Sequence, residues 1–132
     1  IVCVMREENP LASRDEIDIA ELHDVSVITY LPHALLRSQI DQAFSEAGAV
    51  PRITIQVGLS LTGLMLAYYG AGVALVEASL PRQLRLEGVV WRPIRPRIQI
   101  NTLIVRSSDA NSSRVVEDFV SHLKQLIASL AA

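Results

Sequence analysis

The clearest pattern of apolar and polar positions lies in residues 51–84. Residues 52–57 alternate and are rich in β-branched side chains, which is typical of a strand. An apolar helix follows, and either Ser60 or Thr62 is placed to cap it. Residues 73–76 form a short, wholly apolar run, which predicts a buried parallel strand. The order of strand, helix and strand predicts a βαβ unit in which both strands run the same way.

Side chains with binding chemistry follow both predicted strands. Ligands of open parallel sheets bind beyond the carboxyl ends of the strands, so residues 58–60 and 76–77 are expected to share one rim. Ser60 either caps the helix or contacts a ligand, and the two roles are compatible. Glu77 either recognises a cationic ligand or caps a short helix that we expect at residues 77–84.

Outside this unit, the chain continues to alternate between short strands and helices. The helix at 34–47 is amphipathic, with Leu36, Ile40 and Phe44 on one face and polar side chains opposite. The remaining elements are expected as strands at 1–5, 25–30, 89–91 and 99–106, a helical turn at 17–22 and a terminal helix. The pattern is that of an α/β protein.

Composition excludes several classes of function. The chain has 132 residues, about one domain, and its 12 basic and 14 acidic residues give a net charge of −2. This balance lacks the basic field that binding of nucleic acid requires, so the chain alone is not expected to bind DNA. The single cysteine, Cys3, and the spacing of the three histidines predict no disulfide, no metal site and no cofactor. No apolar run is long enough for a membrane span and no signal peptide is visible, so we expect a soluble cytoplasmic protein.

Both ends of the sequence suggest a piece of a longer protein. The chain opens directly on the apolar run at 1–5, and its last helix carries an apolar stripe that needs a partner surface. The stripe consists of Val116, Phe119, Leu123, Leu126 and Leu130, widened by Val115, Val120 and Ile127.

Several short motifs, in this order and spacing, resemble the effector-binding domain of LysR-type transcriptional regulators. They are 9–12 (NPLA), 17–22 (IDIAEL), 39–44 (QIDQAF), 47–48 (AG), 51–53 (PRI), 70–76 (GAGVALV) and 92–94 (RPI). The resemblance covers the whole of 1–132 and implies a Rossmann-like lobe of a type 2 periplasmic-binding-protein-like fold. It implies that 6–98 form the second lobe, that 1–5 and 99–106 are strands crossing between lobes, and that 107–132 carry the terminal helix of the first lobe. The DNA-binding domain and most of the first lobe would then lie outside this sequence.

The resemblance also implies a function, which is sensing of a small-molecule effector in the cleft between the lobes. By resemblance, this chain contributes Leu31, Pro32, His33, Gly58, Leu59, Ser60, Val76 and Glu77 to that cleft. Glu77 departs from the family pattern, in which proline is frequent at this position. The expected effector is a carboxylate or amino-acid-like metabolite, and no enzymatic activity is expected. His33 is either a ligand contact or a solvated loop residue, and Tyr30 is expected in the core or an interface.

Family members act as oligomers on DNA, and the resemblance implies a homodimer or homotetramer whose subunit arrangement responds to the ligand. The helix at 34–47 is the candidate subunit contact, through Arg37, Gln39, Ile40, Asp41 and Phe44; otherwise its polar side is an ordinary solvated face. DNA would be bound only through the N-terminal domain that this sequence lacks.

Two other functions compete with this interpretation. A solute-binding protein of a transporter shares the two-lobed fold. A serine hydrolase could use Ser60 in a loop that resembles a nucleophile elbow, with Glu77 and His122 following in order. Against the hydrolase, Thr62 replaces the second glycine of the elbow, His122 lies within a helix, and the chain is short for that fold.

Overall fold

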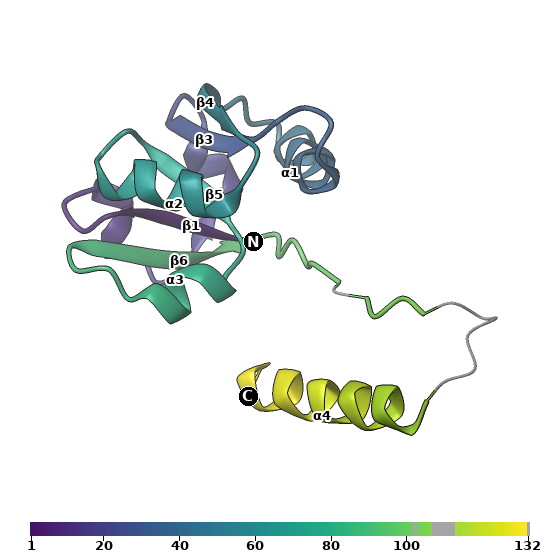
Figure 1. Ribbon diagram of the computed structural model, residues 1–132. Coiled ribbons are helices and arrows are strands. Elements are labelled where there is room, and N and C mark those ends of the chain that lie inside the picture. The colour runs from purple at the N-terminus through teal and green to yellow at the C-terminus, as the bar shows by residue number, and fades with distance from the viewer. Residues whose placement is uncertain (102, 107–112, 132) are drawn as a thin grey trace. The chain divides into compact units, whose positions relative to one another are not determined.

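The computed structural model describes residues 1–101, 103–106 and 113–131, which belong to a unit of residues 1–101 and a second unit of residues 102–132. The first unit holds six strands, two 3-10 helices and three α-helices (Figure 1). In chain order these are β1 (Val2–Arg6), η1 (Pro10–Ser13), β2 (Ile17–Asp18), η2 (Ile19–Leu22), β3 (Ser26–Tyr30), α1 (Leu35–Glu46), β4 (Arg52–Val57), α2 (Ser60–Tyr68), β5 (Val73–Val76), α3 (Ser79–Leu84) and β6 (Val89–Arg95). The second unit contains α4 (Arg114–Ala131).

The six strands form one sheet in the order β2-β6-β1-β5-β3-β4. β3 lies between β4 and β5 and is parallel to both, so the predicted βαβ unit with strands in one direction is confirmed. β1 runs the opposite way and pairs antiparallel with β5 on one side and β6 on the other. The sheet is therefore mixed, with a single reversed strand near its middle.

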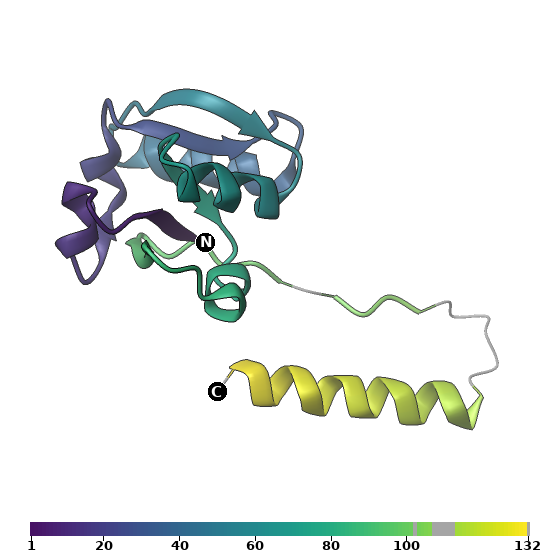
Figure 2. The same ribbon diagram turned by 60° about the vertical axis from the view of Figure 1, so that its left-hand side comes forward.

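Helices cover both faces of this sheet (Figures 1 and 2). On one face, α1 and the two 3-10 helices pack over the sheet and enclose a cluster that includes Ile19, Ile40 and Phe44. On the other face, α2 packs over a second cluster that includes Leu64, with residues of α3 at its margin. β5 contributes alternate residues to the two clusters, and all four of its residues are buried, as expected of a strand covered on both faces.

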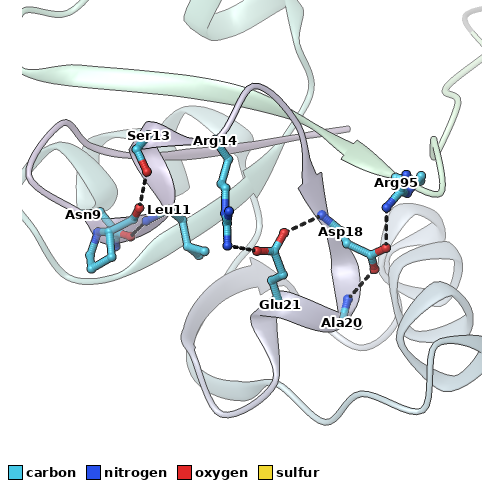
Figure 3. A network of polar contacts seen from close by, with 9 residues as sticks. Asn9, Leu11, Ser13, Arg14, Asp18, Ala20, Glu21 and Arg95 are labelled. Atoms are coloured by element: carbon cyan, nitrogen blue, oxygen red, sulfur yellow. Dashed lines mark hydrogen bonds and ion pairs between the residues drawn. The ribbon is translucent and has the colours of Figure 1, made fainter.

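The segment between β1 and β3 is held by hydrogen bonds from side chains to backbone (Figure 3). Asn9 caps η1, and Asp18 caps η2 by accepting from the Ala20 N–H at 3.0 Å. Glu21 returns to accept from the Asp18 N–H at 3.1 Å, which completes a capping box. Arg95, at the end of β6, donates to Asp18 at 3.0 Å and ties this turn to the sheet. The helical turn predicted at 17–22 is thus divided between β2 and η2.

Two features of the chain require glycine. α2 ends at Tyr68, and Gly70 follows with a φ of +81°, in the left-handed region that favours glycine. Gly72, just before β5, has a φ of +148°, and a Cβ there would lie 2.7 Å from the Ser26 carbonyl oxygen. The close approach of these two backbones positions β5 beside β3.

The strand predicted at 99–106 is not formed: residues 99–101 and 103–106 lie in no strand, and residue 102 is outside the described residues. A strand depends on hydrogen bonds from a neighbour, and in the described part of the chain none lies alongside this segment. The terminal helix is confirmed as α4, and within its predicted apolar stripe Val116, Phe119 and Leu126 are exposed, with Phe119 at 65%, whereas the Leu130 side chain lies outside the described residues. The assignments of 1–5 and 99–106 to crossover strands and of 107–132 to the first lobe stay predictions.

Candidate functional site

The carboxyl ends of β3, β4 and β5 lie at one edge of the sheet because the three strands are parallel. The helices that follow them lie on different faces. β3 leads into α1 on one face, whereas β4 and β5 lead into α2 and α3 on the other. Neighbouring strands whose connections diverge in this way form a topological switch point, where open α/β sheets bind ligands. β3 ends at Tyr30, and the connections after both of its neighbours, β4 and β5, go to the opposite face of the sheet from the connection after β3.

Three side chains from these strand ends meet in one hydrogen-bonded network. The Tyr30 hydroxyl donates to Glu77 Oε2 at 2.8 Å. The same hydroxyl lies 2.9 Å from the Ser60 Oγ, and because its single proton goes to Glu77, Ser60 is the donor of that second bond. The Tyr30 side chain is otherwise buried, at 4% exposure, so its hydroxyl is a fixed point at the base of the rim. We call Tyr30, Ser60 and Glu77 the rim triad.

The electrostatics of the rim triad favour an ionised Glu77 beside a neutral Tyr30. Burial is the main cause that raises the pKa of Tyr30. The Ser60 hydrogen bond lowers this pKa, whereas the hydrogen bond to the Glu77 carboxylate and its negative charge raise it. Burial also raises the pKa of Glu77, but the polar groups beside it, which are the Ser60 hydroxyl, its own backbone N–H and the Tyr30 hydroxyl, outweigh burial and lower it overall. The rim therefore carries one negative charge, oriented by hydroxyl groups.

Both capping assignments made from the sequence are wrong. The N-cap of α2 is Leu59, without a side-chain hydrogen bond, and Ser60 and Thr62 lie within the helix. The N-cap of α3 is Ala78, again without a side-chain cap, so Glu77 does not cap that helix. The Ser60 hydroxyl and the Glu77 carboxylate are instead engaged with Tyr30. The assignment of Tyr30 to the core is half right, because its ring is buried while its hydroxyl belongs to the rim.

The other predicted effector contacts surround the rim triad to different degrees. Leu31, Pro32 and His33 form an exposed loop after β3, and the Leu31 N–H donates to the Val57 carbonyl at 3.1 Å. A Cβ on Gly58 would lie 3.8 Å from the Leu31 Cδ1, so the loops after β3 and β4 touch. Leu59 is 70% exposed, whereas the Val76 side chain is buried under α2 and offers only its backbone to the rim.

In α1, the helix predicted as a subunit contact, more side chains are buried within this chain than the sequence suggests. Ile40 and Phe44 are buried in the core of this chain. Arg37, predicted on the polar face, is also buried: its Nη1 donates to the Tyr30 carbonyl at 2.8 Å and its Nε to Asp41 at 2.8 Å. Of the predicted interface residues, Asp41 is exposed and Gln39 is partly exposed.

Other chemistry has less support in the described residues. The partners found for the Ser60 hydroxyl are a phenol and a carboxylate, whereas a nucleophilic serine needs a base such as an imidazole on its hydroxyl. In the part of the chain that the structure describes, no group of three or more His, Cys, Asp or Glu side chains is arranged to hold a metal ion. Nor does any helix among these residues have the length and apolar character to cross a membrane.

A hollow of about 270 Å³ lies away from the rim, between α2, α3 and the start of β6. Leu64, Pro81, Arg85, Leu86, Val89 and Trp91 line it. On the three adjacent strands β6, β1 and β5, Trp91 lies opposite Val4 and Val4 lies opposite Ala74. Ala74 is three residues before Glu77. The hollow is thus nearer the amino end of β5 and is separate from the rim triad.

Comparison with known proteins identifies the class. The family model of the LysR substrate binding domain matches residues 1–128, and the chain belongs to this family. The regulatory protein NocR of Agrobacterium tumefaciens (strain T37) is 26% identical over 129 residues, which are 98% of this chain and 43% of NocR. The HTH-type transcriptional regulator SsuR of Burkholderia cenocepacia is 28% identical over 127 residues, 92% of this chain and 41% of SsuR. The chain thus spans less than half the length of these relatives.

Solved structures agree on the fold. The regulatory domain of CcmR from Synechocystis PCC6803, in complex with 2-PG, has a TM-score of 0.74 at 15% identity, covering 95% of this chain and 61% of that one. The effector-binding domain of QuiR, in complex with shikimate, has a TM-score of 0.65 at 23% identity, covering 91% of this chain and 57% of that one. The predicted α/β class and the type 2 periplasmic-binding-protein-like fold are confirmed.

Proposed function

We propose that this chain supplies one wall of the effector cleft in a LysR-type transcriptional regulator and that the rim triad forms the floor of that wall. The observation that carries the proposal is the meeting of Tyr30, Ser60 and Glu77 at the switch point of the sheet. Around it, the effector contacts are Leu31, Pro32, His33, Gly58, Leu59 and the backbone of Val76. Tyr30 is added to the residues that the sequence suggested.

The effector is a small metabolite that bears a carboxylate or resembles an amino acid. α2 begins at Ser60, and free backbone N–H groups at the start of a helix hold carboxylates without a dedicated cation. The structures of CcmR with 2-PG and of QuiR with shikimate support small-molecule binding in a domain of this fold.

Effector binding controls transcription through the arrangement of subunits. A ligand that binds one lobe geometry more tightly shifts the population toward it, and in an oligomer this shift moves the attached DNA-binding domains. The assembly is a homodimer or homotetramer in the cytoplasm, in which α1 contributes Gln39 and Asp41 to the subunit contact. DNA is bound by a domain outside this sequence, and the domain that senses the effector has no enzymatic role.

The solute-binding alternative has less support, because both curated relatives described above are regulators and the matching family model is that of the regulators. A hydrolase based on Ser60 has less support still, because the Ser60 hydroxyl is engaged by Tyr30.

The test is a thermal-shift screen of the full-length protein against amino acids, aromatic acids and sugar phosphates. A ligand at about 100 times its Kd stabilises the native state by about 2.7 kcal/mol and raises its Tm. We expect at least one class to raise the Tm of the wild type, and Ser60→Ala to reduce that shift. The proposal fails if no compound shifts the wild type, or if Ser60→Ala and Tyr30→Phe leave every shift unchanged.

A further inference from the structure

The negative charge of Glu77 is oriented but not neutralised. Among the described residues, no Lys or Arg side chain forms an ion pair with Glu77. The Tyr30 hydroxyl donates to it, and the other groups that act on it at short range are the neutral Ser60 hydroxyl and its own backbone N–H. The Ile1 amino group also attracts this charge, but its effect on the pKa of Glu77 is weaker than those of the Ser60, backbone and Tyr30 groups, and it donates its own hydrogen bond to the Ile98 carbonyl at 2.7 Å.

In the described part of the chain, the lack of a cationic side chain beside Glu77 distinguishes it from other partly buried carboxylates. Other half-exposed acids of this chain are matched by arginine, as Asp18 is by Arg95 and Glu21 by Arg14. Removing a carboxylate from water is costly unless its charge is paired, and the cost increases when a ligand and a second lobe exclude water. A cationic nitrogen of the ligand would remove this cost, since hydrogen bonds between two charged groups are about twice as strong as neutral ones.

Exposed apolar side chains follow the strand ends next to Tyr30 and Ser60. Leu31 and Leu59 flank the rim triad and are 43% and 70% exposed, and the Leu31 side chain lies against the Gly58 backbone. A single exposed leucine is unremarkable, but two of them beside an unneutralised charge form a surface with both an ionic and an apolar component.

Building on the effector site proposed above, we propose that the effector carries a primary amine or guanidinium group. This cationic nitrogen binds the Glu77 carboxylate, and an apolar part of the same molecule packs against Leu31 and Leu59. Tyr30 and Ser60 are positioning residues in this arrangement, because they hold the carboxylate toward the cleft.

The test compares ligands that differ only in the charged group. L-leucine, 3-methylbutylamine and 4-methylpentanoate share one apolar skeleton, and L-lysine and L-arginine extend the set of cationic probes. Binding to the full-length protein is followed by thermal shift and by titration calorimetry. We expect at least one amine-bearing probe to bind and 4-methylpentanoate to bind at least tenfold more weakly.

Glu77→Gln keeps an acceptor for Tyr30 but removes the charge, and we expect it to weaken binding of the amine probes by about tenfold or more. Glu87→Gln, the same change at an exposed position in the turn before β6, is the matched control and should leave binding unchanged. Circular dichroism of both variants confirms that they are folded.

The outcomes separate this proposal from the effector-sensing function. If 4-methylpentanoate or another compound without a cationic nitrogen is the tighter ligand, or if Glu77→Gln binds amines as the wild type does, the cationic effector is refuted while effector sensing stands. If no amine-bearing compound binds, the cationic effector is likewise refuted. If no compound of any class binds, the effector-sensing function fails too.

Discussion

Replacing Arg37 by methionine tests whether this arginine fastens α1 to the end of β3 beside the rim triad. The guanidinium donates to the Tyr30 carbonyl at 2.8 Å and to both Asp41 oxygens at 2.8 and 2.9 Å, and its side chain is only 10% exposed. Methionine keeps an unbranched apolar stem of similar reach but removes every donor.

The magnitude follows from the burial of each partner. A hydrogen bond from a charged donor to a backbone carbonyl contributes about 1.5–3 kcal/mol when one partner is removed and the other stays buried. The pair with Asp41, whose side chain is 51% exposed, adds about 0.2–1 kcal/mol. Packing of the methionine offsets part of this loss, so we expect Arg37→Met to cost about 2 kcal/mol. In a domain of about 100 residues, that lowers the Tm by roughly 8–16 °C.

The control is Asp41→Asn, which weakens the exposed ion pair but leaves the bond to the Tyr30 carbonyl. We expect it to cost about 0.5 kcal/mol. Urea unfolding followed by circular dichroism gives both free energies of unfolding. The reasoning is refuted if Asp41→Asn is as damaging as Arg37→Met, or if Arg37→Met lies within about 0.5 kcal/mol of the wild type.

Three further predictions concern the backbone, the thiol and the charge of the rim. Gly72→Ala places a Cβ 2.7 Å from the Ser26 carbonyl oxygen, so we expect a loss of at least about 3 kcal/mol in urea unfolding. Gly48→Ala, also at positive φ but with open space around the Cβ, should cost only about 1–2 kcal/mol. Cys3 is fully buried and burial raises its pKa, so alkylation by iodoacetamide should proceed only at the rate of unfolding, and rapid labelling of the native protein would contradict its burial. Because folding lowers the pKa of Glu77, its stabilisation is present above the ordinary pKa of glutamate and disappears as the pH falls through the lowered value. Glu77→Gln should therefore flatten the acid side of a plot of Tm against pH, and an unchanged acid side would contradict an ionised carboxylate.

The sequence predicted the central unit well because local signals there agree with the fold. Alternating β-branched residues give β4 its observed bounds, 52–57, and the apolar run gives β5 its bounds, 73–76. The parallel direction of these strands also indicates the edge of the sheet at which the polar side chains that follow them lie. The rim position of Ser60 and Glu77 was therefore predictable, although their partner was not.

What the sequence could not predict depends on contacts between distant residues. Tyr30 is 30 residues from Ser60 and 47 from Glu77, and nothing in the local pattern shows that its hydroxyl reaches both. The capping rules applied to Ser60 and Glu77 consider a helix end by itself. In the folded chain, both side chains form hydrogen bonds with the distant Tyr30 network instead of capping a helix. Arg37 lies among polar neighbours in the helical pattern, yet a carbonyl at a strand end supplies the partner that allows its burial.

The reversed strand β1 has a consequence for synthesis on the ribosome. Its two partners are made long after it, since β5 begins 67 positions beyond Arg6 and β6 later still. At about 5–20 residues per second, Cys3, Val4 and Met5 wait roughly 3–13 s for a first neighbour. β3 and β4, by contrast, can pair as soon as α1 has been made. The growing chain thus carries the apolar residues of β1 unpaired until β5 has been made, which makes β1 a segment that chaperones would need to protect during translation.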